Sequence, residues 1–322
     1  MSGQYAKGQL KLFALNSNVE LAEKVANVLN TTLSTASVKH FSDGEIQINI
    51  DESIRGADIY IIQSISNPVN ENLMELLIMV DALRRASAGT INVVMPYYGY
   101  ARSDRKARSR EPITAKLVAN FIQLAGVSRV ITLDLHAAQL QGFFNIPVDH
   151  LVSLEIQAKY FIENGITDDV VVVSPDHNSV KGARNMAEKL KAQIAIVDKR
   201  GSDFADNSAE TSIIGDVKGR RCIVIDDMID TGTMMTDAAR ALKAAGATDI
   251  YACATHAVMS EGAIEALSDD NIKQVIVTDS IVVPEADKLD KLVRLSVADL
   301  FGQAIDLIHK NRSVDKLFTE KN

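Results

Sequence analysis

The stretch CIVIDDMIDTGTMMTDAARAL, residues 222–242, indicates the fold class of this chain most clearly. It starts as an apolar, β-branched run typical of a buried strand, and this run ends in Asp226 and Asp227. Asp230 and the turn TGT (231–233) follow, and an amphipathic helical pattern comes next. A glycine-containing turn that opens a helix presents free backbone N–H groups and the positive end of the helix dipole. The stretch therefore predicts a βα unit with an anion-binding turn.

The three carboxylates of this stretch have two interpretations. At the end of a strand they can accept hydrogen bonds from sugar hydroxyls or hold a metal-bound water, while the turn holds a phosphate. The simpler alternative is an Asp- and Thr-rich helix cap without a ligand. Three acids combined with an anion-binding turn favour the ligand site.

The same alternation of strand and helix continues outward in both directions. Strands are expected at 11–16, 46–50, 58–64, 91–96, 129–135, 169–174, 192–198, 221–226, 250–256 and 273–279. Segments such as 19–30, 71–86 and 114–126 carry apolar residues at helical spacing. Alternating βα units predict an α/β fold with mainly parallel sheets covered by helices on both faces.

The two halves of the chain resemble each other. LFALNSNVELAEKVANVL (12–29) parallels VVVSPDHNSVKGARNMAEKL (171–190), and later units match in the same order. Any two βα units look somewhat alike, but the matching order favours a duplicated domain. We expect one domain over 1–150 and a second over 151–322, with the tail 304–322 packing back on the first. A length of 322 residues also suits two domains.

Composition excludes several classes of protein. A net charge of −8 argues against general nucleic-acid binding. No apolar run reaches the roughly 18 residues of a membrane helix, and the first residues do not read as a secretory signal. Cys222 and Cys253 could pair, but free buried thiols in a reducing compartment fit their strand-like surroundings better. A cytoplasmic protein is expected.

One segment departs from the acidic average. Five of the nine residues over 102–110 are Arg or Lys, and they follow a strand and a glycine-containing turn, where α/β proteins place ligand loops. A solvated basic loop is the alternative, but this position favours a site for a polyanion.

Four further stretches carry a family resemblance. They are FSDGEIQINI (41–50), PYYGYARSDRK (96–106), TLDLHAAQLQGFF (132–144) and SPDHNSVKGAR (174–184). Together with 222–242 and the C-terminal RSVDKLF, they resemble the signatures of ribose-phosphate pyrophosphokinases, in family order and over nearly the full length. The resemblance implies two tandem phosphoribosyltransferase-like domains of Rossmann-like α/β fold.

It also implies a reaction, transfer of the diphosphoryl group of Mg–ATP to the C1 hydroxyl of ribose 5-phosphate. The products would be 5-phosphoribosyl 1-diphosphate, for nucleotide biosynthesis, and AMP. The family further implies a homo-oligomer, with dimers assembling to a hexamer, and phosphate or ADP as effectors. By resemblance, the 41–45 turn reaches into the ATP site of a neighbouring subunit.

The resemblance assigns roles to individual residues. For ATP it implies Phe41, Asp43, Gly44, Glu45, Arg102 and Ser103; for ribose 5-phosphate it implies Asp226, Asp227, Asp230, Thr231, Gly232, Thr233, Met234 and Gly201. Lys199, on a catalytic loop, and Arg102 would stabilise the transferring group, and His136 and Asp176 would hold Mg²⁺. A phosphate effector would bind Ser53, Arg55, Ser87, Arg110, Gln141 and Ser313. These roles fit the chemistry, since Phe41 can stack on a purine and cations stabilise phosphoryl charge. Imidazole, however, is not a usual ligand of magnesium.

The chain departs from the family at three places. Thr233 and Met234 stand where a glycine and a threonine are usual, which adds a Cβ to the turn and removes a hydroxyl. Gly201 replaces an arginine, and Asp315 replaces a serine, so that its charge would weaken phosphate activation. A weakly active or regulatory paralogue is therefore one alternative. A phosphoribosyltransferase is a second, although FSDGE, TLDLH and the duplication argue against it.

Overall fold

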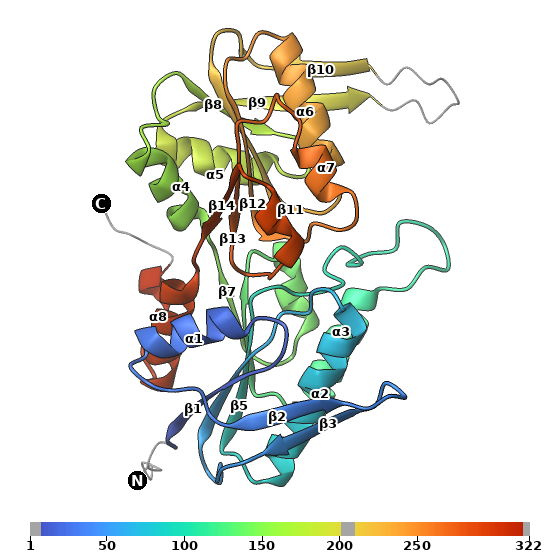
Figure 1. Ribbon diagram of the computed structural model, residues 1–322, viewed down its shortest axis with the longest axis vertical. Helices are drawn as coiled ribbons and strands as arrows, with labels where there is room; N and C mark the ends of the chain where they lie inside the picture. Colours follow the sequence, from blue (N-terminus) through green and yellow to red (C-terminus); the bar gives the residue numbers. More distant parts are fainter. Residues whose placement is uncertain (1–7, 201–209, 318–322) are drawn as a thin grey trace. The chain divides into compact units, whose positions relative to one another are not determined.

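The computed structural model describes residues 8–200 and 210–317, which form two compact units (Figure 1). The first unit contains the described residues up to Val152 together with those from Ser296 onward. The second contains the described part of Ser153–Leu295. Thus the last helix of the chain belongs with the N-terminal half, and the change from one unit to the other lies at Val152–Ser153.

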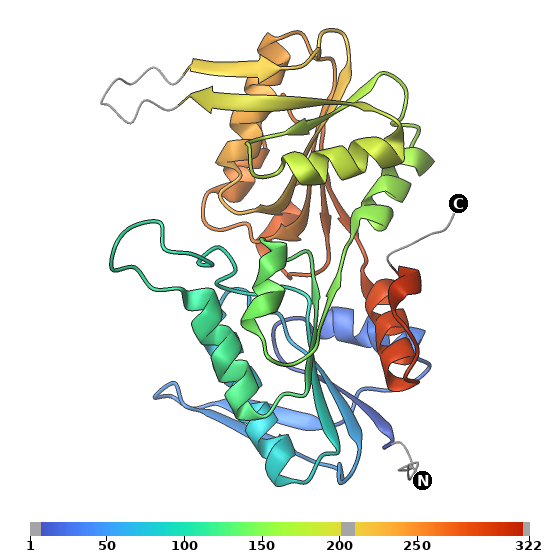
Figure 2. The same cartoon turned by 180° about the vertical axis from the view of Figure 1, so that it is seen from behind.

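The first unit is built on a five-stranded parallel sheet of order β1-β4-β5-β6-β7. Its strands are β1 (Leu10–Ala14), β4 (Asp58–Ile62), β5 (Thr90–Met95), β6 (Arg129–Leu133) and β7 (Val148–Leu151). A separate antiparallel hairpin consists of β2 (Ala36–His40) and β3 (Ile46–Ile50), drawn in blue in Figures 1 and 2. All central strands are buried on both faces, as expected for parallel strands under helices.

Helices cover this sheet. They are α1 (Val19–Val28), α2 (Val69–Arg85), α3 (Thr114–Ala125) and α8 (Ala298–His309), with short 3-10 turns η1 (Ala138–Phe143) and η3 (Asp315–Leu317). The side chain of Asn18 caps α1 by accepting from the Leu21 N–H. Gly302 allows α8 to approach α1 closely, because a Cβ there would lie 2.5 Å from Val28 Cγ1. This contact ties the C-terminal helix to the first unit.

The second unit has a seven-stranded sheet of order β10-β9-β8-β11-β12-β13-β14, in which only β10 is antiparallel to its neighbour. Its strands are β8 (Val170–Ser174), β9 (Gln193–Arg200), β10 (Glu210–Ile214), β11 (Arg221–Ile229), β12 (Ile250–Ala257), β13 (Gln274–Thr278) and β14 (Leu292–Leu295). Its helices are α4 (Leu154–Glu163), α5 (Val180–Leu190), α6 (Thr233–Ala244), α7 (Ala263–Leu267) and the 3-10 turn η2 (Pro284–Lys288).

Two cores lie on the two faces of this second sheet. Val171 and Val173 of β8 face the core under α6 and α7, while Val170 and Val172 face the core under α5. This alternation is the period of two that a strand imposes. The opposite views of Figures 1 and 2 show α6, in orange, and α5, in yellow-green, on opposite faces.

The two units share one topology. The order β1-β4-β5-β6-β7 repeats as β8-β11-β12-β13-β14, so β11 and α6 are the counterparts of β4 and α2. In each unit an antiparallel pair, β2–β3 or β9–β10, is inserted between the first two of these strands along the chain. The predicted α/β fold of two tandem phosphoribosyltransferase-like domains is confirmed.

No helix among the described residues is long and apolar enough to cross a membrane. Cys222 and Cys253 are buried and free, and burial raises the pKa of the Cys222 thiol to about 12. That thiol is therefore protonated and inert at neutral pH.

Candidate active site

The Asp226–Asp227 pair lies within β11 rather than at its end. The strand continues to Ile229, which corrects the expectation that it stops at the carboxylates. On one side Asp226 pairs in register with Ala254 of β12, whereas pairing with β8 stops at Val224. The β8 side of β11 is therefore open where the two carboxylates stand, at the carboxyl edge of the sheet. Ligands of open α/β sheets bind at this edge.

Asp226 is held by two donors in a largely buried place. Its Oδ1 accepts from the Ser179 hydroxyl at 2.7 Å and from the Asp227 N–H at 2.9 Å. Burial and, second, the neighbouring charge of Asp227 raise the pKa of Asp226 to about 7. The hydrogen bond from Ser179 acts in the opposite direction. The pair is thus poised to share a proton near neutral pH, or to bind donors such as sugar hydroxyls.

The turn after β11 opens α6. Gly232 has φ +75° and is the residue before the helix, and a Cβ there would lie 3.0 Å from Leu267 Cγ. Thr233 is already the first residue of α6 and has no positive φ. The Cβ that Thr233 adds therefore does not meet a left-handed backbone, because that position of the turn is occupied by Gly232.

Hydroxyls and a carboxylate border this turn. The Thr231 and Thr233 hydroxyl oxygens lie 3.1 Å apart, and Asp230 accepts from the Ser260 hydroxyl at 2.7 Å. Met234 is exposed at the start of α6, where the N–H groups of a first helical turn point outward. The predicted sugar-phosphate residues 226–234 therefore lie along one continuous strand–turn–helix segment. Gly201 lies outside the described residues.

Asp176 stands at the carboxyl end of β8, the neighbour of β11. Its carboxylate accepts from the Asn178 N–H and side-chain amide and from the Ser179 N–H, at 2.9–3.0 Å. Ser179 thus donates its N–H to Asp176 and its hydroxyl to Asp226, and links the two acids. Sequence reasoning missed Ser179. The signal available was a hydroxyl residue three positions after an aspartate at a strand end.

His136 is exposed just past β6 in the first unit, after Asp134 with φ +35°. The backbone here is held by His150 on β7, whose Nε2 accepts from the Leu135 N–H at 2.9 Å. His150 also went unnoticed in the sequence. Among the described residues, no three His, Cys, Asp or Glu side chains gather as metal ligands do. His136 and Asp176 belong to different units.

The turn 41–45 is the tip of the β2–β3 hairpin. Phe41 donates its N–H to the Glu45 carbonyl at 2.8 Å, and Gly44 has φ +92°. Asp43 accepts from the Glu45 N–H at 3.1 Å. The Phe41 side chain is 50% exposed. An aromatic face and two carboxylates are therefore presented to solvent on a shaped turn.

The basic loop follows β5. Gly99 packs directly on Ile65, since a Cβ there would collide with the Ile65 carbonyl, and Ser103 donates its N–H to Tyr100 O at 2.9 Å. Arg102 is exposed. Lys199 lies on β9 opposite Thr211 of β10, at the root of the second inserted hairpin.

The six residues predicted to bind a phosphate effector lie at opposite ends of the strands of the first sheet. Ser53 and Arg55 precede β4 and Ser87 precedes β5, and the Gly56 N–H donates to Ser87 O at 2.8 Å. Arg110 and Gln141 instead follow the carboxyl ends of β5 and β6. A five-residue strand spans about 17 Å, so one unit does not gather all six. Ser313 follows α8, whose His309 Nδ1 lies 3.2 Å from Asp58 Oδ2 at the start of β4.

Comparisons with known proteins agree with the motifs. A model of the N-terminal domain of ribose phosphate pyrophosphokinase matches residues 10–126, and a model of the phosphoribosyl synthetase-associated domain matches residues 204–319. The chain is 59% identical over 319 residues to ribose-phosphate pyrophosphokinase 1 of Listeria innocua, covering 99% of this chain and 100% of that protein. It is 58% identical over 318 residues to ribose-phosphate pyrophosphokinase of Bacillus cereus, with the same coverage.

A solved structure extends the likeness to three dimensions. The phosphoribosylpyrophosphate synthetase from Mycobacterium smegmatis matches with a TM-score of 0.88 and 40% sequence identity, over 94% of this chain and 99% of that chain. The relatives span both units and every stretch on which the resemblance rests. With this fold, these motifs and full-length relatives, the chain belongs to the ribose-phosphate pyrophosphokinase family.

Proposed function

We propose that this chain transfers the diphosphoryl group of ATP to ribose 5-phosphate, with the sugar phosphate bound along residues 226–234. One observation carries the proposal: the Asp226–Asp227 pair stands on an open strand edge directly before the N-terminus of α6. Carboxylates can accept from ribose hydroxyls while the helix end and its turn hold the 5-phosphate. Family membership supports the same assignment.

In the proposed reaction, the C1 hydroxyl oxygen of ribose 5-phosphate attacks the β-phosphorus of ATP. The bond from that phosphorus to the oxygen shared with the α-phosphate breaks, AMP leaves with the electron pair, and the hydroxyl proton is released. Arg102 and Lys199 stabilise the charge on the transferring group, because such catalysis is mostly positioning and electrostatics. Phe41, Asp43 and Glu45 hold the adenine by stacking and hydrogen bonds.

Asp176 and His136 are the residues proposed to hold magnesium. The carboxylate of Asp176 suits a hard cation, and three nearby donors fix its direction. Magnesium would neutralise phosphate charge on the nucleotide when bound. The ATP chemistry of the family requires a divalent ion, and we propose that this ion is Mg²⁺.

The decisive experiment incubates the purified chain with Mg–ATP and ribose 5-phosphate and follows AMP. AMP that appears only when the sugar phosphate is present supports the synthetase. If no AMP appeared at any substrate concentration, the proposal would be contradicted. The chain would then be a regulatory paralogue, the alternative that the departures at Gly201 and Met234 suggest. Added 5-phosphoribosyl 1-diphosphate and a nucleobase test for a phosphoribosyltransferase.

Met234 is expected to weaken sugar-phosphate binding. A threonine at this first-turn position could donate a hydroxyl to a phosphate oxygen, and a hydrogen bond to a charged group contributes about 1.5–3 kcal/mol. Met234→Thr should therefore lower the KM for ribose 5-phosphate by about tenfold and leave the KM for ATP unchanged. Thr233→Gly should not help, since Thr233 already has helical backbone. Steady-state kinetics of both variants test this, and an unchanged or higher sugar-phosphate KM in Met234→Thr would refute it.

Self-association is part of the proposal, and α3 supports it. Ile113, Leu117, Phe121 and Leu124 are 37–77% exposed and recur at helical spacing on the face of α3 away from the core. A helix that is apolar on both faces needs a partner on each. The residues predicted to bind the phosphate effector are divided between the two ends of the strands, which also fits an effector site shared between two copies of the chain.

Leu117→Glu combined with Phe121→Glu should dissociate the assembly, because two carboxylates would have to be desolvated in the contact. Sedimentation velocity should show a smaller species than the parent chain at equal concentration. The pair Lys159→Glu and Lys181→Glu, exposed in the second unit, serves as the control. If the α3 variant and the parent sedimented alike, this face of α3 would be excluded as the contact between copies.

We propose further that the chain forms dimers that assemble to a hexamer, that it is located in the cytoplasm, and that phosphate or ADP acts as an effector.

A further inference from the structure

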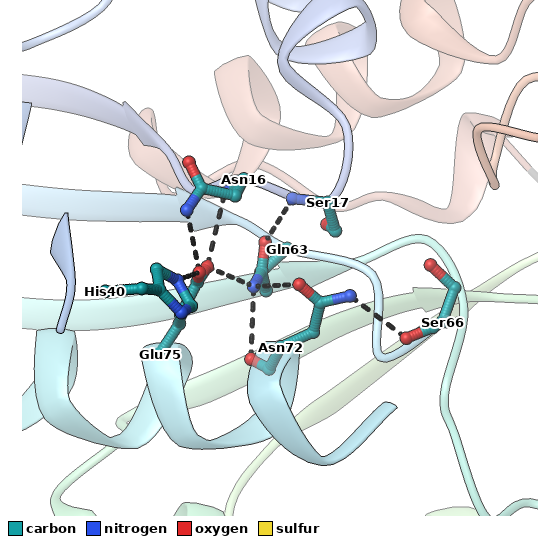
Figure 3. Close-up of polar contacts among 7 residues, drawn as sticks. All are labelled: Asn16, Ser17, His40, Gln63, Ser66, Asn72 and Glu75. Atoms are coloured by element: carbon teal, nitrogen blue, oxygen red, sulfur yellow. Dashed lines mark hydrogen bonds and ion pairs between the residues drawn. The ribbon is translucent and has the colours of Figure 1, made fainter. Parts of the chain in front are cut away.

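Glu75 is a fully buried carboxylate that none of the proposed substrate contacts uses. It lies on α2 with 2% of its side chain exposed. Figure 3 shows it at the centre of a polar network that joins α2 to the ends of β1, β2 and β4. Buried charges require several partners, so the identity of those partners indicates what the carboxylate holds in place.

Three side chains converge on this carboxylate. Asn16 donates through its side-chain amide at 2.7 Å and its backbone N–H at 3.3 Å, and Gln63 donates at 3.1 Å. His40 Nε2 lies 2.8 Å from Oε1. The other contacts to this carboxylate are N–H donors, and Nε2 of His40 lies where it can donate to it as well. Of these three residues, only His40 belongs to the β2–β3 hairpin.

The inner part of the network is buried and extensively hydrogen-bonded. Gln63 is fully buried, accepts from the Ser17 N–H at 3.1 Å, and donates to Asn72 O at 3.1 Å. Asn72 in turn donates to the Ser66 carbonyl at 3.0 Å. The turns after β1 and β4 therefore hold Glu75 in place independently of His40.

The hairpin, by contrast, depends on few contacts near its tip. It is a separate two-stranded sheet, which is marginal by itself. Ile48, Ile50, Val38 and Ala36 pack on the core, but the tip lies beyond them and is exposed from Lys39 to Glu45. A hollow of about 460 Å³ lies between residues 44–46 of the hairpin and α2. His40 is the last residue of β2, directly before Phe41.

We infer that His40 and Glu75 are positioning residues that hold the 41–45 turn in its nucleotide-binding orientation. The inference rests on the proposed role of that turn in binding ATP. The hydrogen bond fixes the backbone one residue before Phe41, so that the aromatic ring and the acids after it need less ordering when ATP binds. Preorganisation of this kind strengthens binding without adding a contact to the ligand.

The chain contains no tryptophan, which permits a direct test of the orientation. Phe41→Trp places a single indole fluorophore on the turn. In the absence of nucleotide, its steady-state anisotropy should fall when His40→Ala is added. It should not change with His40→Gln, which keeps a side-chain N–H donor, or with Lys39→Ala. Lys39 is exposed on the neighbouring position of the same strand, and its side chain points to the other face.

Kinetics in the background that keeps Phe41 measure the consequence. His40→Ala should raise the KM for ATP about three- to tenfold, with kcat and the KM for ribose 5-phosphate within about twofold. His40→Gln should restore the ATP value. Because His40 is partly exposed, the His40 variants leave the fold intact. Glu75→Gln places an amide N–H group next to the N–H donors of Asn16 and Gln63. It should therefore raise the KM for ATP in the same way and also lower the melting temperature.

The outcomes separate the inference from the proposed function. Equal anisotropy in the Phe41→Trp protein with and without His40→Ala overturns the inference. An ATP KM that His40→Ala leaves unchanged, while Asp43→Ala or Glu45→Ala raises it, also overturns the inference and leaves the ATP role of the turn standing. If none of these variants alters the KM for ATP, the assignment of the turn to ATP fails and the inference fails with it.

Discussion

Lys199→Ala is expected to lower kcat at least about 10²-fold while the KM values for ATP and ribose 5-phosphate change little. The physical reason is that the ammonium group is proposed to act on charge that develops only in the transition state. Loss of such an interaction lowers kcat and kcat/KM together. Initial rates of AMP release over a grid of both substrates provide the measurement.

The control for this prediction is Lys218→Ala, which removes an exposed lysine from the turn between β10 and β11. Its kcat should match that of the parent chain. A Lys199→Ala protein with near-parental turnover would remove this residue from the mechanism. A large rise in KM with unchanged kcat would instead assign Lys199 to ground-state binding.

Asp226→Asn should lower kcat/KM for ribose 5-phosphate by about 10- to 100-fold, because ribose hydroxyls would donate to a neutral amide instead of a carboxylate. The amide oxygen can still accept from Ser179 and from the Asp227 N–H, so the local geometry is kept. The KM for ATP should stay within about twofold. Asp216→Asn, at an exposed position of the second unit, is the matched control.

The same variant should be more stable at alkaline pH. Burial and Asp227 raise the pKa of Asp226 in the folded chain to about 7, from about 3.9 in an unfolded chain. Between these values the folded state binds more protons than the unfolded state, so the free energy of unfolding falls as pH rises through the window. An asparagine cannot ionise, and this loss disappears.

The melting temperature of Asp226→Asn should therefore exceed that of the parent by about 3 °C or more at pH 8. For a domain of this size, a change of about 1 kcal/mol in the free energy of unfolding shifts the melting temperature by about 2–4 °C. The difference should shrink steadily as pH falls from about 7 towards 4. A difference that is constant with pH, or a less stable variant at pH 8, would show that Asp226 is not a destabilising charge.

The fold class and much of the candidate site could be predicted from the sequence because they depend on local pattern. Apolar runs of β-branched residues, helical spacing and turn residues reveal βα units one at a time, and their repetition revealed the duplication. The strands β2, β7, β10 and β14 were missed. Each is short, and all four carry polar or charged residues among the apolar ones, so a local pattern does not distinguish them from loops.

The amino-acid pattern alone was enough to predict the α/β class, the tandem domains and the segment 222–242 that joins carboxylates to an anion-binding turn. The three-dimensional structure was needed to show that the acids of β11 lie beyond its pairing with β8, and that Gly232 rather than Thr233 takes the left-handed position. It alone joined Ser179 to Asp226, 47 residues apart, and His40 to Glu75, 35 residues apart. Burial and hydrogen bonds between distant residues arise when helices and strands pack, and no local spacing encodes them.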